Sequence, residues 1–113
     1  MIQQRLDIKP LSINEAFQGK RFKTCKCKSY ETSVNLMLKK GRIEKGEMLR
    51  VEFHFGFSSK ASDLDNPVKI LIDIFQKKYG FNDNQIYEMN IRKNEVKKGD
   101  EFIEFGIYKL LPM

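Results

Sequence analysis

The residues best suited to chemistry are two aspartates in the stretch SDLDNPVKILIDIF, residues 62–75. Alternate residues of an extended segment project to the same side, so Asp63 and Asp65 can present both carboxylates toward one point. Two carboxylates this close repel each other unless a cation or a shared proton lies between them. Mg²⁺ is the usual cation, because it takes hard oxygen ligands and needs only one or two protein carboxylates beside phosphate oxygens. The pair is therefore a candidate magnesium site.

A lysine follows this pair at helical spacing. Lys69 lies four residues after Asp65 and four before Asp73, so Lys69 and Asp73 share one face of a helix. In a site that cleaves phosphodiesters, the lysine could stabilise charge developing on the phosphate, and the helix N-terminus would favour phosphate as well. The alternative is structural: the aspartates are turn and capping residues, and Lys69 with Asp73 is a surface ion pair. The spacing alone leaves both interpretations open.

The elements expected to position these residues are a strand and a helix. The segment MLRVEFHFGF alternates cleanly, which predicts a strand with one buried face: Val51, Phe53, Phe55 and Phe57. After a polar connection, Asn66 is the expected N-cap of a helix and Pro67 its first residue. The expected buried stripe of this helix consists of Val68, Leu71, Ile72, Phe75 and Tyr79. Gly80 is the expected stop.

With the rest of the chain included, the sequence predicts two helices and four strands in total. A first strand should end at Pro10, residues 11–28 read as a loop, and a second helix should run from Ser29 to Gly41. Alternation predicts two further strands, through residues 87–91 and 103–107, with a turn at residues 97–100 between them. We expect one α+β domain over residues 1–113, with a mixed sheet of about four strands and two main helices.

Composition favours a polyanionic partner. Lys and Arg number 21 against 15 Asp and Glu, a formal charge of +6, and a basic body around an acidic spot suits DNA with a cation at the site. No apolar run approaches the ~20 residues that span a bilayer, so we expect a cytoplasmic protein without a membrane contact. Cys25 and Cys27 are expected to be reduced thiols, with a zinc site shared across a dimer as the weaker alternative. His54, the single histidine, is expected to be structural.

One basic segment interleaves Phe22 with positive charges, which fits phosphate contacts and stacking on an unpaired base. The candidate DNA-binding residues are Lys20, Arg21, Lys23, Lys26, Lys28 and, before the aspartate pair, Lys60. The alternative for this segment is a flexible, solvated loop.

The stretch DLDNPVKILIDIFQKKYGFNDNQI, with the YEMNIRK and KKGDEFIEFGI segments after it, resembles the RusA family of Holliday junction resolvases, small phage- and prophage-associated endonucleases. The matching positions of the family signature are Asp63, Asp65, Asn66, Lys69, Asp83, Gln85 and Ile86. The segment PLSINEAF is also similar to the family's N-terminal segment, through Pro10, Ser12 and Asn14. The resemblance covers nearly the whole chain.

The resemblance implies a homodimeric nuclease that depends on Mg²⁺, with Mn²⁺ a possible substitute, and cuts branched DNA symmetrically in recombination and repair. By matched position Asp63, Asp65 and Asp83 would be metal ligands and Lys69 the catalytic lysine. Asn66 and Asp73 would support the site. The chain departs from the family in having Lys60 as the only positive charge of the segment SSKAS, where family members often carry several arginines. The alternative is therefore an inactive family member that binds branched DNA or a phage protein.

Distance raises a question about the third aspartate. A helix from Pro67 to Tyr79 is about 20 Å long at ~1.5 Å per residue. Residues 80–83 can return only about 13 Å when fully extended, at ~3.3 Å each. Either the helix is shorter than expected, or Asp83 reaches the metal of a partner subunit in a two-fold dimer, and we favour the second hypothesis.

Overall fold

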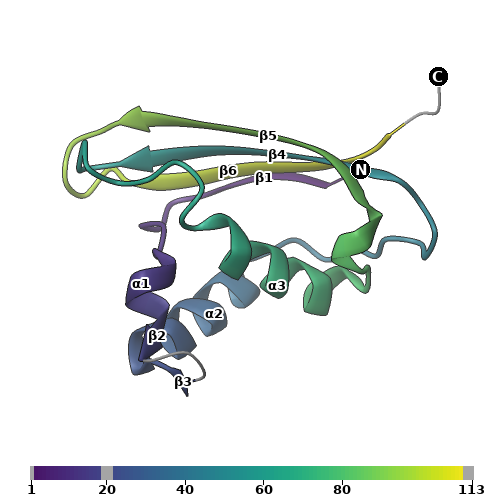
Figure 1. The fold of residues 1–113 in the computed structure, drawn as a ribbon, viewed down its shortest axis with the longest axis horizontal. Helices are drawn as coiled ribbons and strands as arrows, with labels where there is room; N and C mark the ends of the chain where they lie inside the picture. Colours follow the sequence, from purple (N-terminus) through teal and green to yellow (C-terminus); the bar gives the residue numbers. More distant parts are fainter. Residues whose placement is uncertain (1, 19–21, 111–113) are drawn as a thin grey trace.

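The protein is described by a computed structural model covering residues 2–18 and 22–110. A mixed sheet of four strands carries the helices on one face and leaves the other face open (Figure 1). The strands are β1 (Ile2–Leu6), β4 (Leu49–Phe57), β5 (Ile86–Glu95) and β6 (Phe102–Lys109), in the spatial order β1-β6-β4-β5. β5 runs parallel to β4, whereas the β1–β6 and β4–β6 pairs are antiparallel. The predicted α+β class with a mixed four-stranded sheet is confirmed.

Strand β4 lies inside the sheet and carries the core, as its alternation predicts. All four expected inward residues are buried, while Glu52 and His54 point to the open face. The ring of Phe53 stacks on that of Phe75, with centroids 6.0 Å apart, and so joins the strand to helix α3 (Val68–Tyr79). Burial of large aromatic rings supplies much of the stability of a small domain, so this contact helps to fix where α3 lies.

Helix α3 begins one residue later than predicted and is capped differently. Pro67 occupies the N-cap position with no side-chain cap, so the prediction of Asn66 as N-cap is wrong. The chain winds through turns before the helix, and the carbonyl groups of Asp63 and Asp65 accept from the backbone N–H groups of Asn66 and Val68. The Asp65 carbonyl thus satisfies the first N–H of the helix, as a capping side chain would. At the other end Gly80 stops the helix with φ of 77°, as predicted.

Helix α2 (Cys25–Met37) begins before the residue that the sequence favoured. Thr24, not Ser29, is its N-cap, and the Thr24 hydroxyl accepts from the backbone N–H of Cys27. The prediction of a loop over residues 11–28 is wrong where the structure describes them. This stretch contains a short helix, β2 (Phe17–Gln18) paired with β3 (Phe22–Lys23), and the start of α2 at Cys25. Residues 19–21 lie outside the described part. A short helix, α1 (Ile13–Ala16), precedes β2.

The turn at residues 97–100 is present, but it does not join neighbouring strands. The Asp100 N–H donates to the Lys97 carbonyl, and Gly99 takes a φ of 99°, which glycine adopts without strain. Strand β4 lies between β5 and β6, so β5 forms one edge of the sheet. In the ranges described, no helix is long and apolar enough to span a bilayer.

Candidate active site

Three of the predicted residues line one cleft, which we call the α3 cleft. It has a volume of about 300 Å³ and is lined by Lys69, Ile72, Asp73, Asp83, Ile86 and Met89. Lys69 and Asp73 lie one turn apart on α3, and Asp83 begins the 3-10 turn η1 (Asp83–Gln85) that leads into β5. The cleft therefore brings together one cation and two carboxylates. Lys69 and Asp73 come from α3, and Asp83 comes from the turn that follows the C-terminal end of α3.

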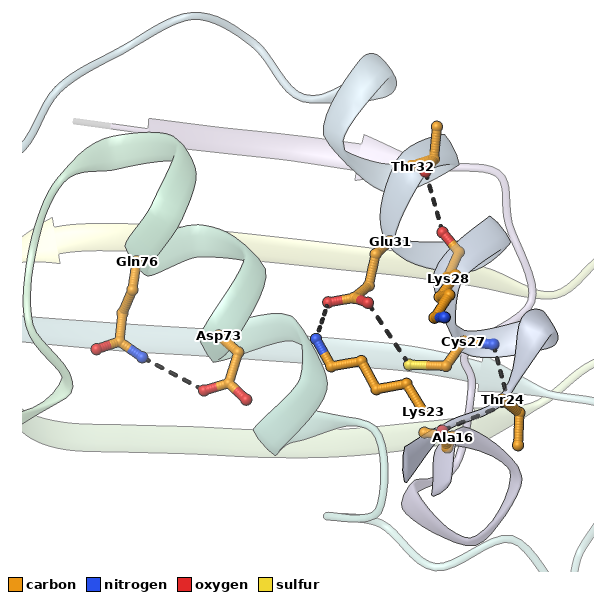
Figure 2. Close-up of polar contacts among 9 residues, drawn as sticks. All are labelled: Ala16, Lys23, Thr24, Cys27, Lys28, Glu31, Thr32, Asp73 and Gln76. Atoms are coloured by element: carbon orange, nitrogen blue, oxygen red, sulfur yellow. Dashed lines mark hydrogen bonds and ion pairs between the residues drawn. The ribbon is translucent and has the colours of Figure 1, made fainter. Parts of the chain in front are cut away.

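Gln76 positions the two carboxylate-bearing segments relative to each other. Its amide Nε2 donates to Asp73 Oδ1 at 3.5 Å (Figure 2), and its Oε1 accepts from the backbone N–H of Asp83 at 2.8 Å. One side chain thus contacts both acidic positions of the α3 cleft. Gln76 is not among the site residues predicted from the sequence. Its helical spacing of three residues from Asp73 was the available signal, but the contact with Asp83 depends on the chain reversal at Gly80.

A buried glutamine holds the η1 turn against the body of the protein. Asn82 and Gln85 form a capping box: the Asn82 side chain accepts from Asn84 N–H, and the Asn82 N–H donates to Gln85 Oε1. Gln85 Nε2 also donates to the carbonyls of Glu44 and Glu47, each at 3.0 Å. These contacts explain why a glutamine stands two residues after Asp83, since it fixes the turn that presents the aspartate.

The other two predicted ligands lie at the opposite end of α3. Asp63 and Asp65 are exposed, and Asp63 lines a second cavity of about 360 Å³ that also includes Glu15 and Glu101. Lys93 of β5 donates from Nζ to the carbonyl of Ser62 at 2.6 Å, which ties the aspartate segment to the edge strand. Asp65 lines neither this cavity nor the α3 cleft.

The three aspartates do not form a metal centre within one chain. No group of three His, Cys, Asp or Glu side chains among the described residues could hold a metal ion. Helix α3 has nearly the expected length, ending at Tyr79, so a shorter helix does not bring Asp83 back to Asp63 and Asp65. Carboxylate oxygens suit Mg²⁺ in kind. The arrangement of one chain therefore offers suitable donors in two places, separated along α3.

Two of the predicted DNA-binding lysines are engaged in ion pairs. Lys23 contacts Glu31 at 2.9 Å (Figure 2), and this hydrogen bond is the main reason that the pKa of Lys23 is raised, with Asp73 adding to the effect. Lys26 pairs with Glu15. Lys28 and Lys60 are exposed, whereas Lys20 and Arg21 lie outside the described residues. The basic segment is thus partly neutralised by its own fold.

Comparison with known families matches residues 12–104 to the family described as endodeoxyribonuclease RusA. The chain belongs to the RusA family. The RusA match includes Lys69 and all four aspartates discussed above, and it runs from the segment before α1 into β6. A search of curated proteins found no match. Membership of this family indicates a DNA endonuclease, an enzyme that hydrolyses phosphodiester bonds. The family is one of Holliday junction resolvases.

Proposed function

We propose that this RusA-family protein is a Mg²⁺-dependent, structure-selective endonuclease that resolves Holliday junctions during recombination and repair in a phage or prophage context, acting in the cytoplasm. The observation that carries the proposal is the α3 cleft, where Lys69, Asp73 and Asp83 meet within the RusA match. A protein that only binds DNA has no evident use for carboxylates near phosphate, because like charges repel.

The roles follow from the chemistry of each group. The Lys69 ammonium would contact a phosphate oxygen and stabilise charge that develops there, while Asp73 and Gln76 hold the wall of the cleft. Asp63, Asp65 and Asp83 would supply oxygen ligands. A divalent ion held by these carboxylates would polarise the scissile phosphate and lower the pKa of an attacking water. Because one chain keeps these ligands apart, the site requires two chains, and we propose a homodimer in which Asp83 joins the aspartate pair of its partner.

The test is a synthetic four-way junction incubated with the protein, with and without Mg²⁺ or Mn²⁺. We expect paired, symmetric nicks in the presence of the metal, and no cutting of a linear duplex with the same sequence. Asp65→Asn should reduce cleavage at least ~100-fold while leaving the protein folded, since Asp65 is exposed. Binding of the junction without cutting in either metal, or cutting that survives thorough chelation, would overturn the proposal.

A further inference from the structure

Lys93 breaks the apolar pattern on one face of β5. Met89 and Ile91 lie on the face that points toward the helices, because both pair with buried residues of β4. Lys93 is the next residue on this face and pairs with buried Phe55. Alternation predicts another apolar residue at this position. A charged residue that departs from the local pattern of a strand is expected where function requires it.

The Lys93 ammonium lies beside the segment that carries the aspartate pair, Asp63 and Asp65. Strands β4 and β5 run parallel, so both end at the side of the sheet from which the chain continues to α3 (Figure 1). There Lys93 Nζ donates to the Ser62 carbonyl at 2.6 Å. Standard peptide bond lengths then place the ammonium less than about 7 Å from the Cα atom of Asp63. The edge strand therefore brings a positive charge to the aspartate pair.

The segment of the aspartate pair carries little positive charge of its own. Residues 58–67, between β4 and α3, include both aspartates but only one cation, Lys60. A phosphodiester that approaches this segment meets two carboxylates, which repel it unless cations offset their charge. One divalent ion would balance the two carboxylates, and the phosphate then adds a further negative charge. The exposed side chain of Lys93 is suited to offset that charge.

The contact with Ser62 leaves Lys93 able to bind an anion. An ammonium has three N–H donors, and the Ser62 carbonyl accepts from one of them, so two remain for phosphate oxygens. Lys23 and Lys26 of the basic segment are held in ion pairs by glutamates. Within the described ranges, in contrast, no carboxylate forms an ion pair with Lys93. Its charge is therefore not neutralised by the fold.

We propose that Lys93 is a phosphate-binding residue, whose ammonium is oriented by the Ser62 carbonyl and contacts a DNA phosphodiester at the aspartate pair. This inference rests on the proposed function, because that function supplies DNA as the ligand. A lysine on an edge strand also prevents pairing with other strands, a role that needs no contact with DNA. The two roles differ in salt dependence, since only a lysine that binds phosphate releases cations condensed on the DNA.

The salt dependence of junction binding tests this role without cleavage. Fluorescence anisotropy measures the dissociation constant of a synthetic four-way junction in EDTA at a series of KCl concentrations. We expect Lys93→Met to weaken binding and to reduce the slope of log Kd against log salt by about 0.9 per lost contact, or about 1.8 for a junction bound by two chains. Lys93→Arg should retain the slope because it keeps the charge. Lys93→Gln should resemble Lys93→Met, although its amide can still donate to the Ser62 carbonyl.

Arg92→Met is the matched control for the loss of one charge. Arg92 precedes Lys93 on β5 but pairs with His54 on the open face, so its replacement should leave the slope nearly unchanged. Equal slopes for the parent and Lys93→Met, an equal loss in Arg92→Met, or a parent protein that does not bind the junction overturns the proposal. A reduced slope for Lys93→Met, with a parent protein that cuts no junction in Mg²⁺ or Mn²⁺, rejects the nuclease proposal alone.

Discussion

Lys69 brings a positive charge into a cleft whose other ionisable walls are Asp73 and Asp83. Its exposed position on the first turns of α3 means that the fold does not need its charge for stability. The side chain can reach a phosphate, and Asp73, one turn later on α3, lines the same cleft. This combination fits a residue that acts on substrate and contributes little to folding.

Replacing this lysine should separate catalysis from folding. We expect Lys69→Met to lower single-turnover cleavage of a four-way junction at least ~100-fold, because a charge aimed at the developing phosphate charge is lost. The free energy of unfolding, measured by urea titration, should change by less than about 0.5 kcal/mol. Lys77→Met, an exposed lysine near the other end of α3, is the control and should cut normally. Similar losses in both variants would argue against a specific role for Lys69.

Gln85 fixes the turn that presents Asp83. Gln85→Ala removes two hydrogen bonds to the carbonyls of Glu44 and Glu47 and one capping contact at a buried position. We expect a loss of about 2 kcal/mol in the free energy of unfolding, measured by urea titration, because these hydrogen bonds and the packing of a buried side chain are lost. Asn84→Ala on the exposed side of the same turn should cost much less. Equal costs would contradict this account.

At the level of elements, α1 and α2 are joined by a pH-sensitive ion pair between Glu15 and Lys26. The hydrogen bond from the Lys26 ammonium is the largest cause of the lowered pKa of Glu15, with burial opposing it. A carboxyl whose pKa is lower in the folded state stabilises the fold above its unfolded pKa, and this contribution is lost as pH falls through the folded pKa. The pair is partly exposed, so the effect should remain below about 1 kcal/mol.

To isolate this contact, the free energy of unfolding of the parent protein is compared with that of the Glu15→Gln variant. We expect the parent to be more stable at pH 6 and the difference to vanish as the pH is lowered below the pKa of Glu15 in the folded protein. Urea unfolding at a series of pH values measures it, and Glu44→Gln, an exposed acid outside this contact, should show no such trend. A difference that persists at low pH would exclude the charge on Glu15 as its cause.

Local signals predicted the elements whose own residues determine them. Alternation in residues 49–57 and the left-handed conformation required at Gly80 are properties of single segments, so β4 and the end of α3 could be predicted. The start of α2 was missed because Thr24 stands inside a lysine-rich run that resembles a loop. The parallel pairing of β5 with β4 was not readable either, because the short turn before β6 looks the same in a hairpin.

The candidate site, too, could be predicted from the sequence only in part. The residue types at positions 63, 65, 69, 73 and 83 were visible in the sequence, and the structure places three of them in the α3 cleft. Their roles stay predictions. The contacts of Gln76 with Asp83 and of Lys93 with Ser62 depend on which elements pack together, and no local pattern encodes them.

On the scale of the whole molecule, a shared site predicts that two inactive proteins can restore each other. Asp83→Asn and Asp65→Asn chains should each fail to cut a four-way junction. When they are mixed and allowed to exchange subunits, a heterodimer has one site with both changes and one with neither. We therefore expect nicking of one strand to return, at up to about a quarter of the parental rate: half of the dimers are mixed in a random assortment, and each has one intact site of two.

The strand-nicking assay distinguishes this result from an unshared site. If each chain supplied all three aspartates to its own site, every heterodimer would carry one change in each site and no nicking would return at any mixing ratio. Mixing Asp65→Asn with Asp63→Asn is the control, because both changes affect the same half of the site and every site of that heterodimer would lack one of them.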